Sequence, residues 1–461
     1  MSVITTENSS LALDPELLSW IEETTGGTVV GTERRPGGGR REAWFIDVRD
    51  SDGELRPLFL RYDRVTPAAK GDPFTLHREA HFYEALDGTG VPVPRILGVH
   101  LTEQAILCTR MRGQTWFSHI QDEDERVSVA RDFMHVLAAL HRVDPHRVRH
   151  PDQIPHMDLR ALVDHELDVW EGIYRSSDAG VDPLIEVSLR WLRRNRPEAT
   201  EPVVIVQGDT GPGNFLYEHG KVTALLDLEM AHLGDPHDDL AWVSLRAVQE
   251  PFTDLRDRLA DYAAQVPWAL DLDRIRYYRV FAELRVVILG HRPRSERDPL
   301  SEVANSLTYG ILHRRLLIEA LADVLGLTIE APPELAADPG AHDWVYHAIL
   351  EQLREIIVPR STDPFVIQRT KGIARLVKYL RQQDLCGTRA EREDLLDLAS
   401  VLGHRPATRR DGMSELADRH ERGELTDASV VAVLARQAAR NTTMLRPVLG
   451  VLADRHFDPL D

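Results

Sequence analysis

The sequence has few cysteines and no long hydrophobic run. Its 461 residues include two cysteines, Cys108 and Cys386, too few for a disulfide framework or for a cluster of thiolate metal ligands. No stretch reaches the roughly 20 apolar residues that a membrane-spanning helix needs. The first residues, MSVITTENSS, show no basic start followed by an apolar segment, so we expect no secretory leader. These absences predict a cytoplasmic protein without a membrane partner.

A positive net charge is also absent. The formal net charge is −19, with 55 Lys and Arg against 74 Asp and Glu. Because phosphate backbones attract basic surfaces, this balance argues against a nucleic-acid partner. An acidic surface would suit a cationic small molecule, but it is also ordinary for a soluble protein, and both interpretations stay open. Hydrophobic residues at 43% and charged residues at 28% describe a globular chain, whose length predicts two or three domains.

The sequence does contain a run of strands, glycines and acids between residues 203 and 240. Four β-branched residues, VVIV at 203–206, predict a short buried strand. The next segment, QGDTGPGN, predicts a tight loop, because glycine adopts backbone angles that other residues resist. Two further strands are expected at 215–217 and 222–226, and the second leads into Asp227. We therefore expect a hairpin with polar side chains at its ends.

Such a hairpin suits metal-assisted phosphoryl transfer. Mg²⁺ prefers hard oxygen ligands, often one or two side chains with water and nucleotide phosphate in the remaining positions. Asn214 and Asp227 could supply those two ligands from adjacent strands. Asp209 lies shortly before Asn214 in the loop, where it could orient an attacking hydroxyl and accept its proton.

These residues carry a family resemblance. Residues 207–214 with Asp227 resemble the catalytic core of aminoglycoside phosphotransferase-like kinases, which reads H-G-D-x-x-x-x-N before a metal-binding Asp. The run DLEMAHLGDPHDDL at 227–240 resembles D-x-E-x-A-x-x-G-D-P-x-x-D-L of a branch related to the kinase-like domains fused to some acyl-CoA dehydrogenases. The family's His is Gln207 here. Because a Gln amide also donates and accepts hydrogen bonds, we expect activity to survive.

The resemblance implies an α+β, bilobal protein-kinase-like fold with a small β-rich N-lobe and a mostly helical C-lobe. It implies ATP and Mg²⁺ as cofactors, catalysis by Asp209, Asn214 and Asp227, and metal binding by Asn214 and Asp227. The expected reaction moves the γ-phosphoryl group to a hydroxyl of an aminoglycoside-like or other hydroxylated small molecule. A catalytically weak or inactive nucleotide-binding scaffold is the alternative, because Gln207 departs from the family and the helical extension is long. Protein kinase activity is disfavoured by the absence of D-F-G and A-P-E motifs.

Four further residues are assigned to nucleotide binding by their place in the family's order. Gly38 and Gly39 lie where the family has its phosphate-covering loop, although PGGG is equally an ordinary hairpin turn. Arg61, in a Phe-Leu-Arg pattern, stands where kinases place a cation for the nucleotide phosphates. Glu79, on a helix expected at 75–86, is its expected partner.

Other polar residues have weaker assignments. Arg110 and Met111 follow an apolar strand at the position of the hinge, where backbone groups would pair with adenine. We expect structural roles for His141 and for Asp235 and Asp239, the last two because Asp-Pro followed by Asp-Leu is typical of a helix start. Five more side chains could line an acceptor pocket or belong to the surface and helix caps: Glu229, His232, Glu283, Arg285 and His291.

The order of elements predicts three domains. The N-lobe is expected over residues 1–112, and the C-lobe, with the catalytic loop and the acceptor-pocket helices, over 113–329. A linker rich in Ala, Pro and Asp precedes a helical accessory domain at 342–461, which shows no catalytic constellation. This domain resembles helical domains that accompany phosphotransferases of the branch. It could pack on the kinase, cap the acceptor pocket or mediate a homodimer, and the sequence leaves these roles open.

Overall fold

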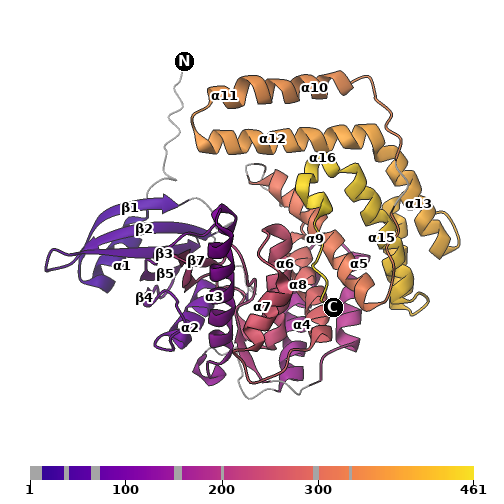
Figure 1. Ribbon diagram of the computed structural model, residues 1–461. Coiled ribbons are helices and arrows are strands. Elements are labelled where there is room, and N and C mark those ends of the chain that lie inside the picture. Colours follow the sequence, from indigo (N-terminus) through magenta and orange to yellow (C-terminus); the bar gives the residue numbers. More distant parts are fainter. Residues whose placement is uncertain are drawn as a thin grey trace. The chain divides into compact units, whose positions relative to one another are not determined.

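The chain combines a β-rich N-terminal part with a mostly helical remainder (Figure 1). The computed structural model describes residues 13–35, 41–63, 73–149, 158–198, 202–293, 299, 301–331 and 335–460. The predicted fold class, α+β with an additional helical C-terminal extension, is confirmed. Two compact units divide the chain, and each combines two segments. The first unit comprises Met1–Leu159 and Thr200–Leu270, and the second comprises Arg160–Ala199 and Asp271–Asp461.

A five-stranded antiparallel sheet opens the first unit, in the order β1-β2-β3-β5-β4. Its strands are β1 (Thr28–Arg35), β2 (Arg41–Arg49), β3 (Leu55–Asp63), β4 (Ile96–Val99) and β5 (Gln104–Thr109). Alternation along β2 turns Trp44, Ile46 and Val48 into the core. Helix α1 (Pro15–Thr25) packs on this apolar face through Leu17 and Ile21, which leaves the opposite face of the sheet for other contacts.

Two short antiparallel sheets hold the segment that the sequence identifies as catalytic. Strand β6 (Val204–Val206) pairs with β9 (His232–Gly234), and β7 (Phe215–Glu218) pairs with β8 (Lys221–Leu225). The sequence does not predict β9, because three residues inside the acidic run show no strand pattern. Its pairing with β6 satisfies backbone groups that burial removes from water. The acidic run at 227–240 therefore begins directly after β8, and its strand β9 lies beside β6.

Four α-helices complete the first unit among its described residues. They are α2 (Leu76–Leu86), α3 (Glu123–His141), α6 (Pro236–Gln249) and α7 (Leu255–Ala263). Helix α3 contacts β6, β8 and α7, and its Phe133 stacks on Phe215 of β7 with ring centroids 4.6 Å apart. Helix α6 begins at Pro236, where Asp235 accepts the backbone N–H of His237 at 2.9 Å. The catalytic segment is thus packed between helices of its own unit.

The second unit is helical throughout its described residues. Its longer helices are α4 (Leu159–Arg175), α5 (Pro183–Arg194), α8 (Leu272–Gly290), α9 (Val303–Val324), α10 (Asp343–Gln352), α12 (Pro364–Gln382), α13 (Thr388–Leu402), α14 (Arg409–Glu421) and α15 (Asp427–Met444). Shorter turns are η4 (Leu353–Ile357), α11 (Val358–Arg360), η5 (Gln383–Gly387) and α16 (Arg446–Leu449). Helix α9 packs on α8 and on α15, so the C-terminal helices share a core with earlier ones. The domain boundaries expected from the sequence stay a prediction.

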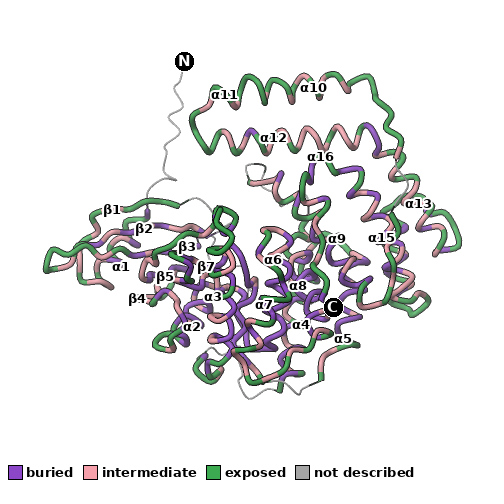
Figure 2. The backbone as a smooth tube through the Cα atoms, viewed as in Figure 1, coloured by how far each residue is buried: buried purple, intermediate pink, exposed green. Residues whose placement is uncertain are grey.

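Burial differs sharply between elements (Figure 2). Helix α6 is buried over most of its length, whereas no residue of α10 is buried. Both cysteines are free and buried. None of the helices in the described ranges is long and apolar enough to cross a membrane.

Candidate active site

The backbone of the two candidate catalytic acids adopts an uncommon conformation. The backbone angle φ is +60° at Asp209, in the loop between β6 and β7, and +58° at Asp227, just after β8. Within the described ranges one other non-glycine residue has a positive φ, His219 in the β7–β8 turn. Positive φ is strained for residues other than glycine and persists where surrounding contacts hold it. The contacts around each acid therefore hold its backbone in this conformation.

Asp239 of α6 anchors the loop that carries Asp209. Its carboxylate accepts the backbone N–H of Gln207 at 2.8 Å and that of Gly208 at 2.9 Å, and it also accepts the hydroxyl of Thr210. The side chain is fully buried, so its charge depends on these donors for the solvation that water would otherwise provide. The Asp239 carboxylate thereby joins helix α6 to the loop that carries Asp209.

His141 of α3 supports the same carboxylate. Its Nε2 lies 2.9 Å from Asp239 Oδ2, and its Nδ1 lies 2.6 Å from the Tyr262 hydroxyl. All three side chains are buried. The structural role predicted for His141 agrees with these contacts. The helix-start role predicted for Asp239 is wrong in detail, because Asp235 caps α6 and Asp239 binds the loop instead.

Gln207, which replaces the family's His, connects the loop to the hairpin. Its Nε2 donates to the backbone oxygen of Leu226 at 2.9 Å, and the whole residue is buried. The neighbouring Gly208 has φ +68°, and a Cβ at this position would lie 2.7 Å from the backbone oxygen of Met230. Only glycine permits this close approach of the loop to the acidic run.

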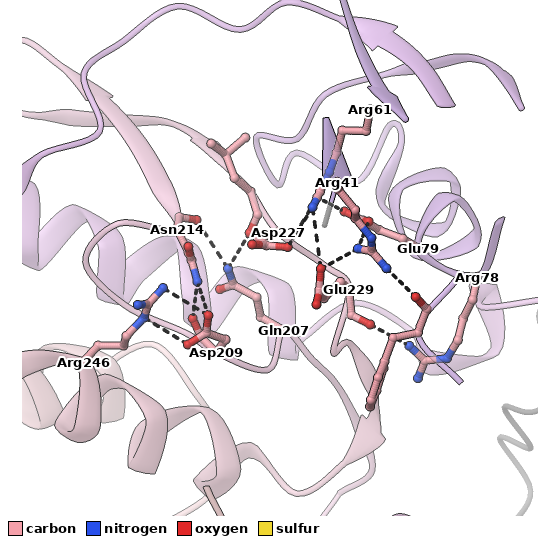
Figure 3. A network of polar contacts seen from close by, with 12 residues as sticks. Arg41, Arg61, Arg78, Glu79, Gln207, Asp209, Asn214, Asp227, Glu229 and Arg246 are labelled. Atoms are coloured by element: carbon pink, nitrogen blue, oxygen red, sulfur yellow. Dashed lines mark hydrogen bonds and ion pairs between the residues drawn. The ribbon is translucent and has the colours of Figure 1, made fainter. Parts of the chain in front are cut away.

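Two side chains orient the carboxylate of Asp209 (Figure 3). Asn214 Nδ2 donates to Asp209 Oδ2 at 2.8 Å and to the Asp209 backbone oxygen at 2.7 Å. Arg246 of α6 places Nε 3.0 Å from Oδ1 and Nη2 3.1 Å from Oδ2. A Cβ on Gly211 would lie 2.7 Å from Arg246 Cβ, so this glycine lets α6 approach the loop. The sequence analysis missed Arg246, because nothing in a helical pattern identifies which Arg faces a loop 37 positions earlier.

Asn214 and Asp227 offer oxygen ligands side by side. Backbone bonds join the two strand ends, since the Leu226 N–H donates to the Asn214 backbone oxygen at 2.9 Å. Neither the Asn214 side-chain oxygen nor Asp227 Oδ2 accepts a hydrogen bond from any described residue. Hard oxygens in this number fit Mg²⁺, which takes its remaining ligands from water and phosphate. Groups of three or more His, Cys, Asp or Glu side chains suited to a metal ion do not occur in the part of the chain that the structure describes.

Arg61 of β3 lies between two acids, as the predicted pairing with Glu79 requires (Figure 3). Its Nη1 is 2.5 Å from Glu79 Oε1 and 3.3 Å from Asp227 Oδ1. Burial alone would disfavour the charged guanidinium, but Glu79 and Asp227 hold the pKa of Arg61 above its ordinary value. At Glu79, which is fully buried on α2, burial raises the pKa even though arginines lie next to it. Arg61 is therefore a fixed cation beside the candidate metal ligand Asp227.

Arg41 and Glu229 extend this cluster, and the sequence analysis did not assign either to the nucleotide site. Arg41 Nη1 is 3.2 Å from Glu79 Oε2 and 2.5 Å from Glu229 Oε2. In the β2–β3 register Ala43 pairs with Arg61, which puts Arg41 on the same face of the sheet as Arg61. Burial and the adjacent Asp227 raise the pKa of Glu229 to about 7. Both residues can be read in the sequence, but their contact depends on the register of β2 and β3, which sequence spacing does not reveal.

Arg78 of α2 attaches this cluster to the acidic run. It is buried, and it donates to the backbone oxygens of Glu229 at 3.1 Å and Ala231 at 2.5 Å. Helix α2 therefore supplies two charged groups: Glu79 contacts the cations of the sheet, and Arg78 contacts the backbone beyond Asp227. The sequence analysis missed Arg78, because the spacing of residues on an amphipathic helix does not distinguish a buried arginine from an exposed one.

Four further residues are predicted to bind the nucleotide, and the structure describes two of them. Gly38 and Gly39 lie outside the described residues. Arg110 donates its backbone N–H to Pro57 and its Nη2 to Asp47 Oδ1 at 2.8 Å. Met111 accepts the Thr109 hydroxyl on its sulfur at 3.9 Å. The assignment of Arg110 and Met111 to a hinge stays a prediction.

The other polar residues considered for an acceptor pocket are engaged within their own units. His232 Nε2 lies 3.2 Å from Asp238 Oδ2 in the first unit. In the second unit, Glu283 Oε2 lies 2.8 Å from His313 Nδ1, and His291 Nε2 lies 2.8 Å from the Gly180 backbone oxygen. Arg285 is buried, with its guanidinium 3.8 Å from the centre of the Phe281 ring.

Known proteins resemble parts of this chain. Acyl-CoA dehydrogenase family member 10 of Mus musculus is 26% identical over 187 residues, which cover 37% of this chain and 16% of the mouse protein. Aminoglycoside 3'-phosphotransferase of Streptomyces fradiae is 28% identical over 200 residues, which cover 39% of this chain and 68% of that protein. The chain thus spans about a sixth of the mouse relative and about two thirds of the bacterial one.

Solved structures and a family profile complete the comparison. A candidate fructosamine-3-kinase from Thermobifida fusca YX-ER1 superposes with a TM-score of 0.47 at 19% identity, covering 67% of this chain and 98% of that chain. The profile described as "Phosphotransferase enzyme family" matches residues 38–278. Because that range is more than half of the 461 residues, the chain belongs to the phosphotransferase enzyme family.

Proposed function

We propose that this phosphotransferase moves the γ-phosphoryl group of ATP to a hydroxyl group of a small molecule. One observation carries the proposal: Asp209 and Asp227 lie on strained backbone at the two ends of one hairpin, with Asn214 hydrogen-bonded to the first and Arg61 to the second. Membership of the phosphotransferase enzyme family also supports it. Strained backbone at two acids, one before and one after the β7–β8 hairpin, supports a role in chemistry, because such strain is common at active sites.

Each residue has a role in this proposal. Asp209, whose carboxylate Asn214 and Arg246 orient, accepts the proton of the attacking hydroxyl. Asn214 and Asp227 hold Mg²⁺, which supplies charge neutralisation on the phosphates when it is bound. Arg61, fixed by Glu79, contacts the nucleotide phosphates. Because phosphoryl transfer passes through a loose and highly charged transition state, positioned charges account for most of the rate in this scheme.

The acceptor is a hydroxylated small molecule. An aminoglycoside is one candidate, since a relative from Streptomyces fradiae bears that name and the net charge of −19 suits a cationic acceptor. Another hydroxylated metabolite, such as a hydroxyacyl thioester or a sugar, is equally compatible, because fold and core motif do not determine the substrate.

We also infer a homodimer formed by the C-terminal helices.

Thermal denaturation tests the nucleotide part of the proposal. A ligand that binds the folded chain alone raises its apparent stability, by about 2.7 kcal/mol at a hundredfold excess over Kd. We expect the unfolding temperature to rise with ATP plus Mg²⁺, and to rise less with ATP plus a chelator. Asp227→Ala is the matched variant and should lose the Mg²⁺-dependent part of the rise. No shift at millimolar nucleotide would overturn ATP as the donor.

Transfer of label tests the reaction itself. ATP labelled at the γ-phosphate is incubated with the enzyme and a panel of aminoglycosides, sugars and hydroxyacyl thioesters. Label should move to at least one class of acceptor with the wild-type chain and not with Asp209→Asn.

The alternative, a nucleotide-binding scaffold without turnover, was suggested by Gln207. In the structure the Gln207 amide makes a hydrogen bond to the hairpin, which is the bracing role expected of the family's His. Binding of ATP without transfer to any acceptor would favour the scaffold. Gain of transfer in Gln207→His would show that the Gln alone is responsible.

A further inference from the structure

Five charged side chains meet beside one face of the five-stranded sheet (Figure 3). Two are arginines, Arg41 of β2 and Arg61 of β3, and three are acids: Glu79 of α2, with Asp227 and Glu229 of the acidic run. Each acid forms an ion pair with at least one of the two arginines. We call these five residues the charged cluster, which contains one acid more than it contains bases.

Glu79 holds the two arginines next to each other. Its Oε2 lies 3.2 Å from Arg41 Nη1, and its Oε1 lies 2.5 Å from Arg61 Nη1. On the same face Ala43 pairs with Arg61 in the β2–β3 register, and its small side chain leaves room for both guanidinium groups. Because two adjacent cations repel each other unless anions lie between them, this arrangement suits a ligand with several negative charges.

Arg41 has hydrogen-bonding capacity that the chain does not use. Its side chain is 3% exposed, Nη1 faces Glu79 and Glu229, and Nη2 donates to the backbone oxygen of Phe74. Its Nε is buried and has no hydrogen-bond partner among the described residues. Most buried donors in folded proteins have an acceptor. Arg41 is therefore an arginine that a bound anion would complete.

The Glu229 carboxylate bridges the two arginines. Its Oε2 lies 2.5 Å from Arg41 Nη1 and 3.7 Å from Arg61 Nη2. A guanidinium group presents the same planar set of donors to a carboxylate and to a phosphate. Glu229 therefore occupies the place that a phosphate group would take between Arg41 and Arg61.

Glu229 is also the acid of the charged cluster that can leave without disturbing the fold. Its side chain is 37% exposed, whereas that of Glu79 is fully buried. Its backbone oxygen accepts Arg78 Nη1 at 3.1 Å, so the main chain is held while the side chain can change rotamer. Asp227 has the metal-binding role of the proposed function. A polyphosphate that approaches the arginines is repelled by the Glu229 carboxylate until that side chain moves away.

We propose that Arg41 is a second phosphate-binding residue beside Arg61, and that Glu229 competes with the nucleotide phosphates for this pair of arginines. The inference rests on the nucleotide site of the proposed function and adds a regulation of that site. In the free chain Glu229 keeps both guanidinium groups paired, which avoids an uncompensated buried charge. When the nucleotide binds, its phosphates take over the two arginines and the Glu229 side chain turns to water. The carboxylate thus lowers the affinity of the chain for nucleotide.

Isothermal titration calorimetry with ATP and a metal chelator tests the competition. The chelator keeps metal binding out of the comparison, and pH 8 keeps Glu229 ionised, because its pKa is about 7. Glu229→Gln removes the competing charge and should lower the Kd for ATP at least about fivefold. Arg41→Gln removes a phosphate donor and should raise this Kd at least about tenfold. Arg41→Lys keeps a charge at the buried position, and a rise in its Kd decides the point if Arg41→Gln does not fold.

Glu42→Gln is the matched control. Glu42 follows Arg41 on β2, but its side chain lies on the opposite face of the sheet, where it accepts the indole N–H of Trp44 at 2.9 Å. The variant removes the same unit of charge, and the Kd for ATP should stay within about twofold of the wild type. An equal gain of affinity in Glu42→Gln and Glu229→Gln would reduce the effect to overall charge and contradict the proposal.

A double variant shows whether the two residues act on the same part of the ligand. If Glu229 lowers affinity by occupying Arg41, the gain from Glu229→Gln should be smaller in a chain that already carries Arg41→Gln. An undiminished gain would show that Glu229 does not compete for Arg41. Far-UV circular dichroism of each variant confirms that its secondary structure is kept.

Inorganic tripolyphosphate separates this proposal from the choice of ATP as the donor. It offers a chain of phosphates without a base, and Glu229→Gln should tighten its binding as it tightens that of ATP. Binding of tripolyphosphate with this dependence, but no binding of ATP, would remove ATP as the donor and leave the competition standing. The competition is overturned if Glu229→Gln and Arg41→Gln leave the Kd of both ligands within about twofold, or if neither ligand binds any of these chains.

Discussion

The loop around Asp209 and the helices α10 and α12 are stabilised in opposite ways. The Asp209 carboxylate has partners in Asn214 and in Arg246 of α6, and α6 is buried along most of its length. Along α10, no residue is buried and the ion pairs are local or join α10 to α12. In the first region the contacts determine one geometry, including strained backbone at Asp209 and Asp227. In the second region the helices form with large apolar side chains, such as Trp344 and Leu380, exposed to solvent.

The difference predicts which substitutions should change the stability of the folded chain. A buried carboxylate with several donors cannot be removed without leaving those donors unsatisfied. An exposed side chain can be replaced with little effect on the monomer, whatever it does in an assembly. The following predictions test this contrast, beginning with the largest effect.

Asp209→Asn should reduce turnover by about 10²- to 10⁴-fold, the range for loss of a general base. The amide keeps the shape of the side chain, so the unfolding midpoint should stay close to that of the wild type. Single-turnover kinetics with saturating acceptor measure the change. Wild-type turnover in this variant would remove Asp209 from the chemistry.

Asp239→Ala should lower the free energy of unfolding by about 3–5 kcal/mol, because it leaves several buried donors and His141 without their acceptor. Asp343→Ala on α10 is the matched control. Its Asp pairs with Arg381 near the surface, so we expect a much smaller loss than for Asp239→Ala. Urea denaturation measures both, and equal losses would erase the contrast between the two regions.

Glu229 should make stability depend on pH in the absence of nucleotide. Its pKa rises from 4.5 to about 7 in the folded chain, so the folded state binds the proton more tightly than the unfolded state. The resulting contribution to stability is fully present below about pH 4.5 and is lost as the pH rises towards about 7. Glu229→Gln should therefore flatten the fall of the urea midpoint between pH 5 and pH 7. Superimposable pH profiles of wild type and variant would contradict this assignment.

Leu380→Gln should have the smallest effect, less than about 0.5 kcal/mol on the monomer. Its side chain is 55% exposed, whereas Leu240 of α6 is completely buried. Leu240→Ala should cost about 2–5 kcal/mol by opening a cavity. Urea unfolding followed by fluorescence measures both changes. A loss above about 2 kcal/mol in Leu380→Gln would mean that the Leu380 side chain is buried in solution.

Local patterns predicted much of this fold. Four β-branched residues at 203–206 predicted the strand β6, and the Asp-Pro pair at 235–236 predicted the start of helix α6. The order of glycines and polar residues in the loop identified Asp209, Asn214 and Asp227 as a group, and the structure brings them to one hairpin. Strand β9 escaped prediction, because three residues hold too little pattern and its pairing with β6 is non-local.

The sequence by itself determined the strands at 203–206, 215–217 and 222–226 and the grouping of Asp209, Asn214 and Asp227, because these depend on residues close together in the chain. Tertiary structure alone decided that Arg246 orients Asp209, and that Arg41 meets Glu229 across 188 positions. Such contacts depend on strand register and helix packing, which no local spacing encodes. Val366, Ile373 and Leu380 of α12 show the same limit. Their seven-residue interval can be read in the sequence, but only the folded chain shows that all three side chains are exposed.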